Sequence, residues 1–114
     1  MTWDDVVTIA GGLPEVELST SYGTPALKVR RKLFARLRED GSVVLMCPLE
    51  EKEALLASGN PALFTTPHYD GYGSVLVDLD RVDPVQLTEL VQDAWRPRAP
   101  ARLRAAHEPP TARG

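Results

Sequence analysis

Two short alternating segments on either side of a tight turn, within residues 27–38, constrain the fold of this chain more than any other feature. The apolar residues of the two segments are Leu27, Val29, Leu33, Ala35 and Leu37, and the basic residues among them are Lys28, Arg30, Arg36 and Arg38. Alternation with a period of two is typical of half-buried strands, so the pattern predicts an antiparallel hairpin. We expect the apolar set to face the core and the basic set to share the outer face.

Capping and turn residues divide the rest of the chain into short elements. We expect helices over residues 3–11, 48–58 and 84–95, because each begins with an N-cap or proline and ends near glycine or proline. Further strands are expected over 42–47, 63–66 and 74–79, and an extended edge segment over 16–22. Residues 101–106 add one or two helical turns.

The size and composition indicate one small domain. The chain has 114 residues, of which 43% are hydrophobic, enough for a single core. We assign the domain to residues 1–106 and expect a disordered tail over 107–114. The longest apolar run is only Val43 to Cys47, so no membrane partner is expected, and the acidic N-terminal residues favour the cytoplasm over secretion. Cys47 is the only cysteine, which excludes an intrachain disulfide.

The net charge of −3 hides a strong segregation of charge along the chain. Residues 26–38 contain six basic and no acidic residues, and residues 95–114 contain five arginines and one glutamate. The stretches 1–25 and 39–94 are acidic. Two basic segments brought together by the fold would form a patch for an anionic partner, with phosphate as the first candidate.

The candidate nucleic-acid-binding residues come from these two basic segments. They are Lys28, Arg30, Arg31, Lys32, Arg36, Arg38, Arg96, Arg98 and Arg102. A two-stranded basic ribbon fits the major groove of DNA, where arginine contacts guanine and lysine contacts phosphate. The alternative is a solvated face that is neutralised by Asp78, Asp80 or the acidic helices, with the C-terminal arginines complementing a helix dipole.

An aromatic cluster forms a second candidate site. The candidate ligand groove comprises Tyr22, His68, Tyr69 and Tyr72. His68 and Asp70 alone are too few to ligate zinc, and no activated serine or nucleotide-binding loop is present. We therefore expect neither a metal, a cofactor nor an enzymatic activity.

Three stretches resemble the MmcQ/YjbR family of small bacterial proteins. They are Gly12 to Val16 with Ser21 to Val29, Thr66 to Tyr72, and Asp93 to Trp95 leading to Ala99 and Pro100. The resemblance covers residues 1 to about 105. It implies an α+β two-layer sandwich of order α-β(3)-α-β(2)-α with an antiparallel sheet, and DNA binding by analogy with double-wing transcription-factor domains. The same architecture is similar to that of secretion chaperones, so the alternative is a protein-interaction module, monomeric or homodimeric, without nucleic-acid activity.

The chain departs from the family pattern at two positions. Arg31 occupies the hairpin turn where members often have glycine, which predicts a positive φ for a non-glycine residue or a longer loop. Ser74 occupies a strand start where many members have tryptophan, so any ligand contact that the tryptophan makes is absent from this chain.

Overall fold

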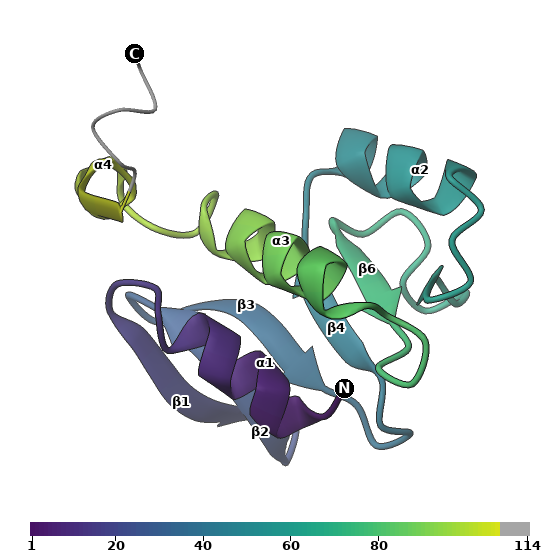
Figure 1. Ribbon diagram of the computed structural model, residues 1–114, viewed down its shortest axis with the longest axis horizontal. Coiled ribbons are helices and arrows are strands. Elements are labelled where there is room, and N and C mark those ends of the chain that lie inside the picture. The colour runs from purple at the N-terminus through teal and green to yellow at the C-terminus, as the bar shows by residue number, and fades with distance from the viewer. Residues whose placement is uncertain (108–114) are drawn as a thin grey trace.

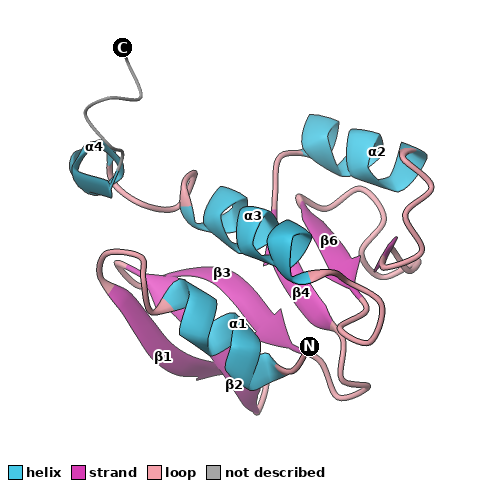
Figure 2. Cartoon of the chain, viewed as in Figure 1, coloured by secondary structure: helices cyan, strands magenta, loops and turns pink. Residues whose placement is uncertain are grey.

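A six-stranded antiparallel sheet organises the structure, a computed structural model that describes residues 1–107. The elements in chain order are α1 (Trp3–Ala10), β1 (Val16–Ser21), β2 (Thr24–Val29), β3 (Lys32–Leu37), β4 (Val43–Met46), α2 (Leu49–Ala57), β5 (Leu63–Phe64), β6 (Ser74–Val77), α3 (Pro84–Trp95) and α4 (Ala101–His107). The strand order is β1-β2-β3-β4-β6-β5, and every neighbouring pair is antiparallel. Helices and strands therefore form two layers, as Figure 2 shows.

Helices α1 and α3 cover one face of this sheet (Figure 1). Their apolar sides meet a row of cross-strand partners, Leu27, Ala35, Leu45 and Val75, which pair in register and therefore point to the same side. Trp95 at the end of α3 is fully buried in this core, and its indole nitrogen donates to the Pro14 carbonyl at 3.1 Å. The hydrophobic core thus lies between the sheet and these two helices.

Local capping explains where the main helices begin. The Thr2 side chain accepts from the Asp5 amide, and the Asp5 carboxylate in turn accepts from the Thr2 amide at 2.7 Å. The Asp83 carboxylate accepts from the Gln86 amide at 2.9 Å, and Pro84 occupies the first position of α3. These signals are encoded within a few residues, which is why the sequence locates both helices.

The α+β class with an antiparallel sheet is confirmed. The sheet contains one strand more than the expected order α-β(3)-α-β(2)-α, because the extended segment at 16–22 pairs with β2 as edge strand β1. A fourth helix, α4, follows α3 and ends at His107, the first residue of the expected tail. The rest of that expected tail, residues 108–114, lies outside the described residues.

The expected orientation of Leu33 is wrong. The register between β2 and β3 shifts after Leu27, so Leu27 pairs with Ala35 while Lys28 pairs with Leu33. The extra residue of this β-bulge is Phe34, which is fully buried in the core. Leu33 consequently lies on the outer face beside Lys28.

The turn between β2 and β3 has the conformation that the sequence led us to expect. Arg30 and Arg31 have φ of 49° and 68°, both in the left-handed region that favours glycine and asparagine. Two consecutive residues with positive φ give the turn that matches the twist of a hairpin. Arg31 therefore adopts the strained conformation without lengthening the loop.

The helices are all short. Among residues 1–107, none is both long and apolar enough to cross a lipid bilayer.

Candidate functional site

The outer face of the sheet, opposite α1 and α3, carries the candidate site. Arg36 pairs with Ala26 on one side and with Val44 on the other, so these three side chains share the outer face. Leu33 joins them through the bulge. Basic and apolar side chains thus adjoin on the same surface, in contrast to the apolar row Leu27, Ala35, Leu45 and Val75 on the core face.

The loop between β5 and β6 forms one wall over this face. Lys52 of α2 is only 4% exposed, and its ammonium group donates to the carbonyls of Tyr69 and Tyr72, the latter at 3.0 Å. Gly73 lets the loop pass close to β4, since a Cβ there would lie 3.0 Å from the Cys47 carbonyl oxygen. Helix α2 and strand β4 therefore fix the aromatic loop in place.

A groove of about 650 Å³ lies between this loop and the sheet. Its lining residues are Tyr22, Leu33, Arg36, Val44, Met46, His68, Tyr69, Tyr72, Gly73, Ser74 and Arg98. This lining contains two guanidinium groups and no carboxylate. The volume lies within the range of about 300–1,000 Å³ that is usual for small-ligand sites. We call this feature the aromatic groove.

Arg36 connects the two sides of the aromatic groove. Its Nη2 donates to the Tyr69 hydroxyl at 2.6 Å, its Nη1 donates to the Thr24 hydroxyl at 3.3 Å, and its Cζ lies 5.5 Å from the centre of the Tyr22 ring. All three partners are neutral, and within residues 1–107 no carboxylate forms an ion pair with Arg36. The guanidinium is therefore not ion-paired, and acidic lining is provided by Glu39 and Asp40 in an adjoining pocket that Arg36 also lines.

The four residues of the expected ligand groove do come together. Tyr22 reaches the groove from the turn after β1, and the other three come from the loop. The His68 ring meets the Tyr69 ring edge-on at 4.8 Å and stacks near Tyr72 at 6.3 Å between ring centres. Tyr22 and Tyr72 are 89% and 62% exposed, so their rings are open to a ligand.

The structure separates the nine candidate cations into groups. Arg36 and Arg98 line the aromatic groove, and Lys28 lies on the same outer face. Arg31 and Lys32 are exposed at the hairpin turn, which lies toward the same end of the long axis as α4 with Arg102 (Figure 1). The hairpin turn and α4 therefore lie toward one end of the molecule, whereas Arg36 bonds the Tyr69 loop that Lys52 of α2 contacts.

Three candidate cations are paired with carboxylates. Arg30 bonds Glu15 at 2.7 Å, Arg38 bonds Asp40 at 3.1 Å, and Arg96 bonds Asp93 at 3.3 Å. Asp78, an expected neutralising partner of the hairpin, instead pairs with Arg81. Neutralisation of the basic hairpin is therefore partial, and it comes from Glu15 and Asp40.

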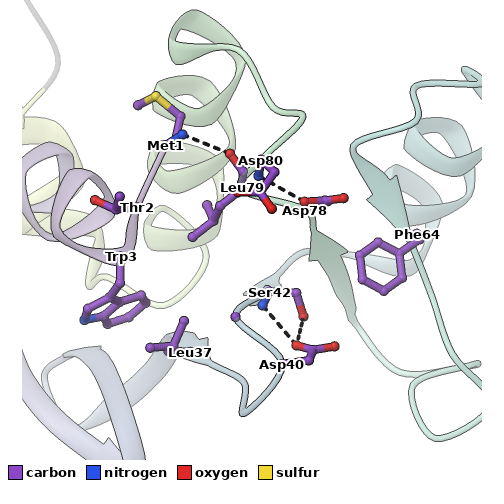
Figure 3. A pocket seen from close by; sticks show the side chains of 11 residues that line it. Met1, Thr2, Trp3, Leu37, Asp40, Ser42, Phe64, Asp78, Leu79 and Asp80 are labelled. Atoms are coloured by element: carbon purple, nitrogen blue, oxygen red, sulfur yellow. Dashed lines mark hydrogen bonds between the residues drawn. The ribbon is translucent and has the colours of Figure 1, made fainter.

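A separate pocket of about 490 Å³ near the N-terminus is acidic (Figure 3). Asp40, Asp78 and Asp80 line it together with apolar side chains such as Trp3 and Phe64. Asp40 accepts from the amide and hydroxyl of Ser42, and Asp78 accepts from the Asp80 amide at 3.0 Å. The carboxylates of Asp40 and Asp78 thus have structural roles in turns, and the negative charge of the pocket opposes a phosphate ligand.

The surroundings of the Cys47 thiol and of the possible metal ligands in the fold decide which chemistry they can support. Burial raises the pKa of the Cys47 thiol to about 11, with Glu51 adding to the effect, so the reactive thiolate is scarce near neutral pH. Within the described part of the chain, no three histidine, cysteine or acidic side chains gather as a metal site would require. The lining of the aromatic groove offers aromatic rings, apolar side chains and two guanidinium groups.

Several residues that line or support the aromatic groove were not predicted from the sequence. Val44 and Met46 could have been predicted, because alternation along β4 places their side chains on the other face of the sheet from those of the core residues Val43 and Leu45. The orientation of Leu33 depends on the bulge at Phe34. The role of Lys52 depends on its hydrogen bond to the Tyr72 carbonyl, 20 residues away in the chain. Neither of these last two features has a local signal.

Comparisons with known proteins agree with the resemblance seen in the sequence. The family model described as YjbR matches residues 11–97. Uncharacterized protein Rv2570 of Mycobacterium tuberculosis and uncharacterized protein Mb2600 of Mycobacterium bovis are each 36% identical over 121 residues, which cover 90% of this chain and 92% of the relative.

A solved structure supports the fold independently. The crystal structure of Deinococcus radiodurans protein DR2400, with a DUF419 domain, superposes with a TM-score of 0.73 over 93% of this chain and 87% of that chain, at 20% sequence identity. At that identity the likeness concerns the fold. The family match, together with the two mycobacterial relatives, shows that this chain belongs to the YjbR family.

Proposed function

We propose that this YjbR-family chain is a non-enzymatic, cytoplasmic nucleic-acid-binding protein that uses the outer face of its sheet. The observation that carries the proposal is the placement of Arg36 and Arg98. These residues are 62 positions apart in the sequence, yet they line one groove that contains no carboxylate. A surface that gathers cations from distant segments favours an anionic partner with several charges.

The hairpin extends this positive surface beyond the groove. Within the described residues, Lys28, Arg31 and Lys32 form no ion pair with a carboxylate, and the last two are exposed at the turn. Glu17 of β1 lies across from Lys28 in the strand register. The ion pairs of Arg30 and Arg38 are partly exposed, and such pairs contribute only about 0–1 kcal/mol. A phosphate can therefore compete for these arginines at little cost.

The salt dependence of binding tests this proposal. Fluorescence anisotropy would follow the purified protein with a labelled random-sequence strand of 20 nucleotides and with the same strand as a duplex. Contact with about five phosphates predicts a several-hundred-fold loss of duplex affinity between about 50 and 200 mM salt. Absence of saturable binding to both probes at the lower salt concentration would refute the proposed function.

Matched arginine variants locate the binding surface. Arg36→Gln and Arg98→Gln each remove a cation from the groove, whereas Arg81→Gln removes one that pairs with Asp78 outside the groove. We expect the first two variants to weaken binding and to reduce the salt dependence, with little effect from the third. Equal effects of all three variants would indicate nonspecific charge attraction.

The open edge of the sheet supports protein interaction as a second candidate function. Strand β1 pairs only with β2 in the described structure, so its other side can accept a further strand. Leu18 on this strand is 71% exposed. Light scattering of the protein and of Leu18→Lys, at equal concentrations, would test association: a dimer that the substitution disrupts supports this alternative, and a concentration-independent monomer argues against self-association.

A further inference from the structure

The two most exposed aromatic rings of the site flank the aromatic groove. Tyr22 is 89% exposed and has a φ of 53°, a conformation that is unfavourable for a bulky residue. Tyr72 is 62% exposed at the other wall. Neither ring contributes to the core, so the fold itself gives no reason for an aromatic side chain at these two positions.

Arg36 links these walls at a fixed position. The Thr24 and Tyr69 hydroxyls orient its guanidinium plane, and the plane lies near the Tyr22 ring. An arginine held in this way binds a phosphate with less loss of conformational freedom than a free side chain. Arg98 supplies a second cation in the same groove.

The floor of the groove is apolar between these cations. Leu33, Val44 and Met46 line it, and Val44 is only 1% exposed. A flat aromatic ligand that carries phosphate matches an apolar floor, aromatic walls and guanidinium groups at once. Bases inside a duplex are stacked on their neighbours and cannot present their faces to such walls, whereas the bases of a single strand can.

We propose that the aromatic groove binds an unpaired base of a single-stranded nucleic acid. This base stacks on one of the rings of Tyr22 and Tyr72, its neighbour in the strand stacks on the other ring, and Arg36 and Arg98 hold the phosphates beside them. This inference rests on the proposed nucleic-acid binding and specifies its substrate as single-stranded.

Tyrosine variants provide the test, with anisotropy of a labelled 20-nucleotide single strand that cannot pair with itself as the readout. Stacking of one base per ring predicts that Tyr22→Ala and Tyr72→Ala each weaken strand binding about 5- to 150-fold. Tyr22→Trp retains the ring and should retain the affinity. Val85→Ala removes a comparably exposed apolar side chain outside the groove and serves as the control, while unchanged circular dichroism would show that each variant is folded.

The duplex probe separates this inference from the proposal beneath it. Stronger binding of the strand than of its duplex, with loss of that preference in the alanine variants, is the expected result. Equal binding of both probes that is insensitive to Tyr22→Ala and Tyr72→Ala would overturn the inference and leave nucleic-acid binding standing. Binding of neither probe would refute both. Thymidine 5′-monophosphate that binds as tightly as the strand would overturn the assignment of a strand as the ligand.

Discussion

Replacement of Lys52 by methionine should destabilise the fold and loosen the aromatic loop. Lys52 is 4% exposed and donates to two carbonyls, those of Tyr69 and Tyr72. Each hydrogen bond from a charged donor contributes about 1.5–3 kcal/mol. Methionine preserves the packed aliphatic stem and removes the desolvation cost of the ammonium group, which is itself several kcal/mol. We therefore expect a net loss of about 2 kcal/mol in the free energy of unfolding.

Thermal and exchange measurements would check this value. At about 4 °C per kcal/mol for a domain of this size, Tm should fall by about 8 °C. Lys32→Met makes the same chemical change at an exposed position and should leave Tm nearly unchanged. Amide exchange should accelerate at Tyr72, whose amide donates to the Tyr69 carbonyl at 3.1 Å. An unchanged Tm together with unchanged loop exchange in Lys52→Met would refute the role assigned to this lysine.

Three further predictions concern the hairpin turn, the Asp40 carboxylate and the Cys47 thiol. Arg31→Gly should raise the free energy of unfolding by about 1 kcal/mol, because glycine adopts a φ of 68° without strain, and a lower Tm would contradict this reading of the turn. The hydrogen bonds from Ser42, with a smaller contribution from the Arg38 guanidinium, lower the pKa of Asp40 from 3.8. A lowered folded-state pKa stabilises the protein above the unfolded-state value, and this contribution is lost as the pH falls through the folded-state value. Urea unfolding of Asp40→Asn and wild type should therefore differ at about pH 6 and converge as the pH falls below the folded-state pKa. A difference that grows with acidity would contradict this sign. Because burial raises the pKa of Cys47 to about 11, an aromatic disulfide reagent should modify it only after unfolding, and rapid reaction of the native protein at about pH 8 would show that the thiol is accessible.

The sequence predicted those parts of the fold that depend on neighbouring residues. The capping residues Thr2 and Asp83 locate α1 and α3, and alternation identifies the β2–β3 hairpin. The positive φ of Arg31 was also predictable, because a tight hairpin turn requires it whatever residue is present. In each case the signal lies within one short stretch of neighbouring residues.

The orientation of Leu33 was not predictable from alternation. A bulge inserts one residue and reverses the faces of the residues before it, and its position depends on which side chain fills the core best. Phe34 is larger than Leu33 and is fully buried, so the register that buries Phe34 prevails. This single shift gives the aromatic groove part of its apolar floor.

The same distinction between local and long-range contacts applies to the candidate site. Lys28 and Arg36 are positioned by one pair of strands, and their outward placement follows from the hairpin alone. The aromatic groove instead requires Lys52 on α2 to hold the loop, and Arg36 on β3 to meet Tyr69 on that loop 33 positions later. Attraction of phosphate by the hairpin depends mainly on its charge. Stacking of bases requires that the loop and the sheet place Tyr72 and Tyr22 correctly on the two sides of the groove. Perturbing the α2–loop contact should therefore weaken single-strand binding while leaving the electrostatic contribution of the hairpin intact.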